Sequence, residues 1–179
     1  AQNNTSNADI YNTAVGYHAG KSVTTGLYNN IIGGLAGDAL TTGSSNVAIG
    51  VSALSGEDTG SRNIAIGHSA LASLNYDGSG YNIAIGYDAG KSISTGIKNT
   101  LIGSLAGDSL TTGQRNVAIG YLALGTEDTG GKNVAIGNEA LATLDAGADA
   151  YNVAVGYDAG KSVTTGIYNT LVGGTAGDS

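Results

Sequence analysis

The chain of 179 residues contains no proline, cysteine, methionine, tryptophan or phenylalanine. Without cysteine it has no disulfide framework, no cysteine-ligated zinc site and no thiol nucleophile. The absence of proline excludes collagen and proline-rich linkers, and the 31 glycines recur at fixed positions, which argues against a flexible linker. The apolar residues are nearly all Ala, Val, Ile and Leu, which fit a narrow core rather than a thick globular one.

Basic residues are also scarce, with seven Lys and Arg against fourteen Asp and Glu, so the formal net charge is −7. This balance disfavours a nucleic-acid partner, because phosphates need neutralising cations. The seven basic residues lie far apart along the sequence and form no run. No apolar run approaches the ~20 residues that span a bilayer, so we expect no membrane insertion.

The chain consists of one motif, Asn-x-x-(Ile/Val)-Gly-x-x-Ala, which is repeated ten times at spacings of 17 or 19 residues. A fixed short period predicts a solenoid in which each repeat forms one coil. We count columns from the asparagine of each coil as zero. The asparagines should stack as an amide ladder along the rod; they are Asn12, Asn29, Asn46, Asn63, Asn82, Asn99, Asn116, Asn133, Asn152 and Asn169.

A second period of 70 residues lies above the first, with equivalent blocks beginning at 12, 82 and 152. We therefore interpret residues 1–179 as a single solenoid array, cut from a longer fibre. Each block of 70 residues contains four coils, and the fourth coil has two extra residues. They lie within "NYDGSG" (75–80) in the first block and "DAGADA" (145–150) in the second. These segments should protrude as loops and are the candidate contact sites, with candidate residues Asn75, Tyr76, Asp77, Asp145 and Asp149.

Columns 1 to 3 predict a short β-strand that the glycine of column 4 ends. Side chains alternate across a strand, so column 3, always Ile or Val, is expected inside the coil with column 1. Column 2 is then an apolar outward face that another copy of the chain should cover. The glycine of column 14 should supply a positive φ at a turn. The predicted oligomer seam comprises Ala14, Ile31, Ala48, Ala65, Ala84, Leu101, Ala118, Ala135, Ala154 and Leu171.

The repeats "NIAIGYDAG" and "NVAIGYLAL" resemble those in the head domains of trimeric autotransporter adhesins, and the longer pattern "NTAVGYHAGKSVTTG" resembles repeats of phage and marine-virus tail fibres. The resemblance covers residues 11–179, although the adhesin repeats are shorter. It implies a parallel β-roll, assembled as a homotrimer.

Three motifs suggest chemistry, and each has a simpler interpretation. "AGKS" at 19–22, 89–92 and 159–162 lacks the first glycine of a phosphate-binding loop, so its lysines are expected on a solvated turn. The two histidines, His18 and His68, occupy different columns and suggest surface residues. The acidic turns at Glu57 and Glu127 could bind calcium weakly, but a solvated acidic face is favoured. We expect no catalytic, cofactor or metal residues.

The sequence thus predicts an all-β parallel solenoid of ten coils in an extracellular fibre, a virus tail-fibre shaft or a bacterial surface adhesin. Its expected partners are copies of itself and a cell-surface glycan or receptor, with no nucleic acid and no cofactor. The alternatives are an ice-binding solenoid, suggested by the repeated Thr-Thr pairs, a glycan-binding solenoid, suggested by tyrosines expected to be exposed, and a trimeric β-helix acyltransferase. The acyltransferase is disfavoured because its six-residue period does not divide a 17-residue coil.

Overall fold

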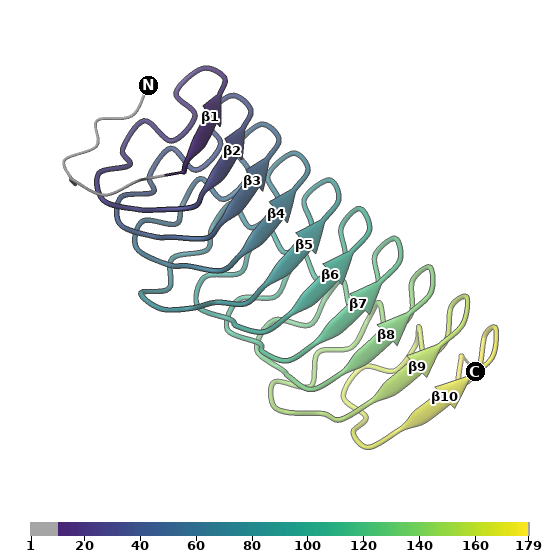
Figure 1. Cartoon of the computed structure of the whole chain (residues 1–179). Helices are drawn as coiled ribbons and strands as arrows, with labels where there is room; N and C mark the ends of the chain where they lie inside the picture. The colour runs from purple at the N-terminus through teal and green to yellow at the C-terminus, as the bar shows by residue number, and fades with distance from the viewer. Residues whose placement is uncertain (1–10, 179) are drawn as a thin grey trace.

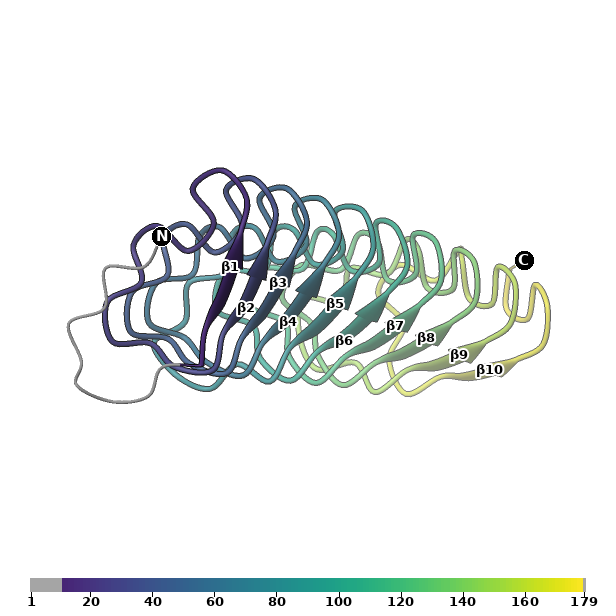
Figure 2. The same cartoon turned by 45° about the horizontal axis from the view of Figure 1, so that its top comes forward.

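The computed structural model describes residues 11–178, which form a rod of stacked coils (Figures 1 and 2). Each coil contributes one three-residue strand, and all ten strands form a single parallel sheet in sequential order. The fold class predicted from the repeat is confirmed. The strands are β1 Thr13–Val15, β2 Asn30–Ile32, β3 Val47–Ile49, β4 Ile64–Ile66, β5 Ile83–Ile85, β6 Thr100–Ile102, β7 Val117–Ile119, β8 Val134–Ile136, β9 Val153–Val155 and β10 Thr170–Val172.

The register of the sheet follows the sequence columns without a slip, even across the 19-residue coils. Ala48 of β3 pairs with Ala65 of β4, and Ala65 pairs with Ala84 of β5 beyond the first insertion. Because every coil places the same column beside its neighbour, any property of one column becomes a continuous line along the rod. Figure 2 shows these strands lying side by side from one end to the other, with a gradual twist.

The asparagine column forms a hydrogen-bonded ladder, as the sequence predicts. The Oδ1 of Asn29 accepts the backbone N–H of Asn46 at 2.9 Å, and its Nδ2 donates to the Gly43 carbonyl of its own coil at 2.9 Å. Asn99 repeats this pattern with Asn116 and Gly113. In the 17-residue coils each amide therefore links two coils and closes one, which satisfies backbone groups that lie out of reach of water. In the 19-residue coils the link to the next coil remains, but Asn63 Nδ2 donates to the Ser61 carbonyl and Asn133 Nδ2 has no hydrogen-bond partner within residues 11–178.

The interior is lined by columns 2, 7 and 11, with leucine at column 8 in some coils. Ala48, Leu101 and Ala118 of column 2 have no exposed surface. Column 3 instead faces outward: Val15, Ile32 and Val172 are 57%, 39% and 70% exposed, and the other members are partly exposed. The predicted assignment of faces was therefore wrong.

The buried column cannot be an oligomer seam, because each coil covers it with its own chain. Eight of the ten predicted seam residues are fully buried in this core, namely Ile31, Ala48, Ala65, Ala84, Leu101, Ala118, Ala135 and Ala154. Ala14 and Leu171, in β1 and β10, pack against the same core while partly exposed. The physical reason is volume: the narrow interior has room for alanine beside the strand, whereas Val and Ile of columns 1 and 3 stand outside.

In the 17-residue coils, columns 8 and 11 complement each other in filling the interior. Leu40 fills the interior from column 11 where column 8 is Gly37, and Leu54 fills it from column 8 where column 11 is Glu57. Each 17-residue coil therefore takes one branched aliphatic side chain from these two columns, whereas the 19-residue coils bury both, Leu71 with Leu74 and Leu141 with Leu144.

In the 17-residue coils the column-14 glycines do not adopt a positive φ, which corrects the sequence prediction. Left-handed residues occur instead at columns 4, 6 and 8 and just before the asparagine. Gly43 of column 14 is required for another reason: a Cβ there would lie 2.2 Å from the carbonyl oxygen of Gly60 in the next coil. Glycine here permits two backbones to approach closely.

Candidate functional site

The features that could carry function lie on the outside of the rod, because residues 11–178 enclose no pocket. Three are distinguished by side-chain arrangement: the sheet face, the edge that carries the inserted loops, and the ion-paired turn of the AGKS coils. Within the described chain, no helix is long and apolar enough to cross a membrane.

The outward sheet face is formed by columns 1 and 3, which are mainly Val and Ile. Val47 and Ile49 of β3 and Val117 and Ile119 of β7 are partly exposed on either side of a buried alanine. Parallel pairing repeats these side chains in every coil, so the face is one continuous strip along the ten strands. We call columns 1 and 3 of the ten strands the β-branched face. A strip of this kind is typical of a protein–protein contact surface.

The inserted loops are held onto the rod by a buried glutamate. Glu57 has no exposed surface, and its carboxylate accepts backbone N–H groups of Gly60 at 2.7 Å and Tyr76 at 3.3 Å. Glu127 repeats the arrangement with Gly130 at 2.8 Å and Ala146 at 3.1 Å. Both glutamates were expected on a solvated face. They lie inside because the inserted loop brings N–H donors that need an acceptor.

Burial raises the pKa of the Glu57 carboxyl above its ordinary value of 4.5, and the backbone donors of Gly60 and Tyr76 oppose this only in part. Burial likewise raises the pKa of Asp108. A carboxyl whose pKa is higher in the folded protein than in the unfolded chain binds its proton more tightly when folded. Its stabilising contribution is therefore present at low pH and is lost as the pH rises through the folded-state pKa.

We expect the midpoint of thermal unfolding to rise by a few degrees as the pH is lowered from about 8 towards 5, measured by circular dichroism. Glu57→Gln should reduce this dependence, because glutamine does not titrate. Asp145→Asn is the control, since it makes the same charge change at the exposed position where the preceding block already has Asn75. An equal pH dependence in parent and Glu57→Gln would contradict the assignment.

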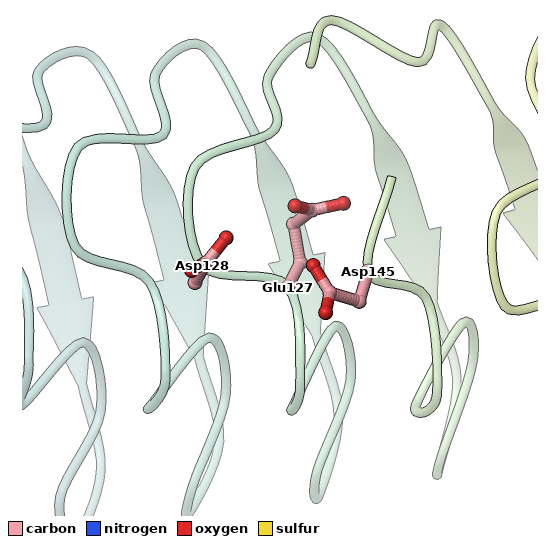
Figure 3. A group of neighbouring side chains, drawn as sticks. All are labelled: Glu127, Asp128 and Asp145. Atoms are coloured by element: carbon pink, nitrogen blue, oxygen red, sulfur yellow. The ribbon is translucent and has the colours of Figure 1, made fainter. Parts of the chain in front are cut away.

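Three acidic side chains meet at the second inserted loop. Carboxylate oxygens of Glu127, Asp128 and Asp145 lie within 4.8 Å of one another, on two neighbouring coils (Figure 3). Glu127 is already engaged by backbone donors. In the preceding block Asn75 stands where Asp145 does, so the complete trio occurs in only one of the two inserted loops. The arrangement brings carboxylates together without making a repeated metal site.

The predicted contact residues are divided between exposed and anchored positions. Asn75 and Asp145 are exposed. Asp77 accepts a hydrogen bond from the Thr59 hydroxyl at 2.8 Å, and Asp149 pairs with Lys132 at 2.7 Å. Tyr76 packs partly buried against the core, so it serves mainly to fasten its loop. Ligand contact at these residues stays a prediction.

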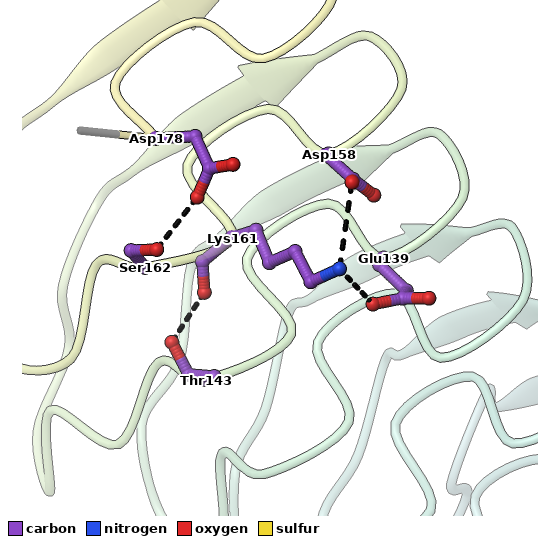
Figure 4. Close-up of polar contacts among 6 residues, drawn as sticks. All are labelled: Glu139, Thr143, Asp158, Lys161, Ser162 and Asp178. Atoms are coloured by element: carbon purple, nitrogen blue, oxygen red, sulfur yellow. Dashed lines mark hydrogen bonds and ion pairs between the residues drawn. The ribbon is translucent and has the colours of Figure 1, made fainter.

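The AGKS turns carry ion-paired lysines rather than isolated ones. Lys21 lies 2.9 Å from Asp38, Lys91 lies 2.9 Å from Asp88, and Lys161 contacts both Glu139 and Asp158 (Figure 4). The hydrogen bond to Asp88 raises the pKa of Lys91, and the one to Glu139 raises that of Lys161. These lysines are largely exposed, so the pairs contribute little to stability.

Both histidines are exposed, as predicted. The His18 ring stacks on Tyr17, with centroids 4.0 Å apart. His68 Nδ1 lies 3.0 Å from the Ser69 hydroxyl and 3.6 Å from Asp88. Serine and aspartate both approach the same ring nitrogen, so these three residues do not form the relay of a serine nucleophile, in which the two ring nitrogens have different partners.

The Thr-Thr pairs divide between two roles. The side chain of the first threonine points along the rod axis towards the next coil. The hydroxyls of Thr24, Thr41 and Thr111 donate to carbonyl oxygens of that coil at 3.0 to 3.2 Å. The second, such as Thr42 or Thr112, is exposed. The adjacent residues therefore point in different directions and do not share one face of the rod.

No protein-family model matches the chain, and no curated protein or solved structure is significantly similar to it.

Proposed function

We propose that this chain is a segment of an extracellular fibre, a rod that associates with copies of itself through the β-branched face and spaces a binding tip from its anchor. The observation that carries the proposal is the unbroken parallel sheet of ten strands with a continuous strip of Val and Ile on its outer side. The resemblance of the repeats to those of tail fibres and trimeric adhesins supports a virion or bacterial surface and a homotrimer.

The geometry suits a mechanical role. Each coil is tied to the next by strand pairing, by the asparagine ladder and by turn hydrogen bonds such as Gly37 N–H to the Ala53 carbonyl at 2.9 Å. Such contacts couple neighbours along the whole length, so a load is shared by many equivalent bonds. The inserted loops of residues 75–80 and 145–150 remain candidate receptor contacts on this rod.

Self-association is tested by placing a charge on the β-branched face. We expect the parent to have a mass of two or more chains in multi-angle light scattering at micromolar concentration, and Ile119→Glu to be a folded monomer, because the carboxylate would be buried in a dry interface. Thr112→Glu is the control, since it adds the same charge at an exposed position away from the strands.

A parent of three chains would support the homotrimer in particular. A monomeric parent, or an Ile119→Glu variant that associates as the parent does, would contradict the proposal. Circular dichroism of both variants shows whether the coils are intact.

A further inference from the structure

The fold gathers most of the basic residues onto one line, although the sequence spreads them far apart. Four of the seven Lys and Arg directly precede the ladder asparagine of their coil, and tyrosine occupies the same position in neighbouring coils. We call this line the basic–tyrosine ridge. Its members are Arg62, Tyr81, Lys98, Arg115, Lys132 and Tyr151.

Backbone hydrogen bonds fix the ridge residues one above another. The N–H of Lys98 donates to the Gly80 carbonyl of the preceding coil at 2.8 Å, and those of Arg115 and Lys132 donate to the Ile97 and Gln114 carbonyls at 3.0 Å. All ridge residues have a left-handed backbone, with φ from 52° to 62°. At the ~4.8 Å spacing of strands, the four cations span about 19 Å.

Two of the cations have no partner within residues 11–178. Lys98 and Arg115 are exposed, and neither side chain makes a hydrogen bond or ion pair there. Lys98, Arg115 and Lys132 occupy three successive coils, and like charges that face each other across paired strands are destabilising. Asp149 is the carboxylate that relieves this repulsion, and it contacts Lys132 alone. Repulsion between these cations therefore lowers the stability of the rod, and an anionic ligand bound to them would offset that repulsion.

The tyrosines lie beside the cations of the ridge, and the Tyr151 hydroxyl accepts a hydrogen bond from Lys132 Nζ at 2.6 Å. Lys132 Nζ lies 4.7 Å from the centre of the Tyr151 ring, and Tyr168 stacks on that ring from the next coil at 5.4 Å. The Arg62 guanidinium lies 5.6 Å from the centre of the Tyr81 ring. Single-stranded nucleic acids bind by stacking bases on aromatic faces, and Tyr81 and Tyr151 are 50% and 43% exposed, so an oligonucleotide is the competing ligand that the test has to include. Phenol hydroxyls between cations suit a ligand that carries both hydroxyl and acidic groups.

We propose that the basic–tyrosine ridge binds an acidic polysaccharide, laid along the rod with its carboxylate or sulfate groups on Lys98 and Arg115. The regular spacing of the cations is comparable to the length of one pyranose ring, so a linear polymer can meet successive coils. This inference rests on the proposed function, because it assigns the ligand class of an adhesive rod. It places the polysaccharide contact on the ridge, apart from the inserted loops, which remain candidate receptor contacts.

The test measures binding of the full chain to immobilised polygalacturonate, heparin and neutral dextran, with an oligo-thymidine strand as competitor. We expect polygalacturonate, heparin or both to bind, more weakly as salt is raised, and dextran not to bind. Which acidic polymer binds tells whether carboxylate or sulfate is preferred. The double substitution Lys98→Gln with Arg115→Gln should weaken binding about tenfold at low ionic strength.

The matched control is Lys21→Gln with Lys161→Gln, which makes the same charge change on another edge and should alter affinity by less than about twofold. An equal loss of affinity in both double variants would show that only the overall charge matters, and it would overturn the proposal that the ridge is the binding site. Tighter binding of the oligonucleotide, equal binding of dextran, or no binding of either acidic polymer would also overturn it.

Light scattering of the ridge variant separates this proposal from self-association, because its oligomeric state should equal that of the parent. Its thermal midpoint should be unchanged or higher, since like charges have been removed. If the parent is a monomer but still binds the polymer through the ridge, the proposed self-association is wrong and the proposed polysaccharide binding is supported.

Discussion

Ala118→Glu is expected to abolish folding of the rod or to lower its stability by several kcal/mol. Ala118 has no exposed surface and lies between Leu101 and Ala135 in the paired strands. An unpaired carboxylate buried at such a site costs about 3–5 kcal/mol, and a whole domain of this size is stable by only about 5–15 kcal/mol. The added volume increases the loss, because Leu124 already fills the same coil.

The adjacent substitution Ile119→Glu is the matched control, since it introduces the same side chain one residue further along β7. Its side chain points outward, so the coil should keep its circular dichroism spectrum and most of its thermal midpoint. Ala118→Leu separates volume from charge and should cost about 1–3 kcal/mol by overpacking. Equal destabilisation by Ala118→Glu and Ile119→Glu in chemical denaturation would show that the two faces of the strand are not distinguished as described.

This pair of residues also shows where sequence reasoning reaches its limit. The period, the ten strands and the asparagine ladder follow from the repeat, because each needs only the recurrence of a column. The choice between Ala118 and Ile119 as the inward residue does not, since both are apolar and alternation alone leaves the direction open. The signal that was missed is size: column 2 is alanine in seven of the ten coils, which suits a thin interior, whereas the Val and Ile of column 3 tolerate a half-buried outer face.

Charged residues were misjudged for a related reason. Lys98 and Arg115 are 17 positions apart in the sequence, so they look isolated until the period stacks them in successive coils. Checking which residue types share a column would have found the ridge. Glu57 is different, because no column rule predicts its burial. Its place inside depends on the N–H of Tyr76, which a two-residue insertion in the next coil brings within reach.

Gly33→Ala should strongly destabilise the rod, although it adds only one methyl group. Gly33 has a φ of +138°, and a Cβ there would lie 2.4 Å from the carbonyl oxygen of Gly50 in the next coil. The same approach recurs along column 4, for example between Gly103 and Gly120 at 2.4 Å. The backbones cannot separate without stretching the strand pairing on both sides. Backbone strain alone costs about 1–3 kcal/mol, and the clash adds to it.

Gly34→Ala provides a control in the neighbouring residue, because a Cβ at that position has no atom within 4 Å and the backbone is not left-handed. Alanine there should change the free energy of unfolding by no more than about 1 kcal/mol, with stabilisation expected from the reduced entropy of the unfolded chain. Urea denaturation of the two variants measures the difference directly, and Gly50→Ala repeats the test one coil further on. If column 4 is stacked this closely, Gly33→Ala and Gly50→Ala should each lose much of the free energy of unfolding, and Gly34→Ala should not. If Gly33→Ala were as stable as Gly34→Ala, the coils would have to be farther apart at column 4 than the strand register allows.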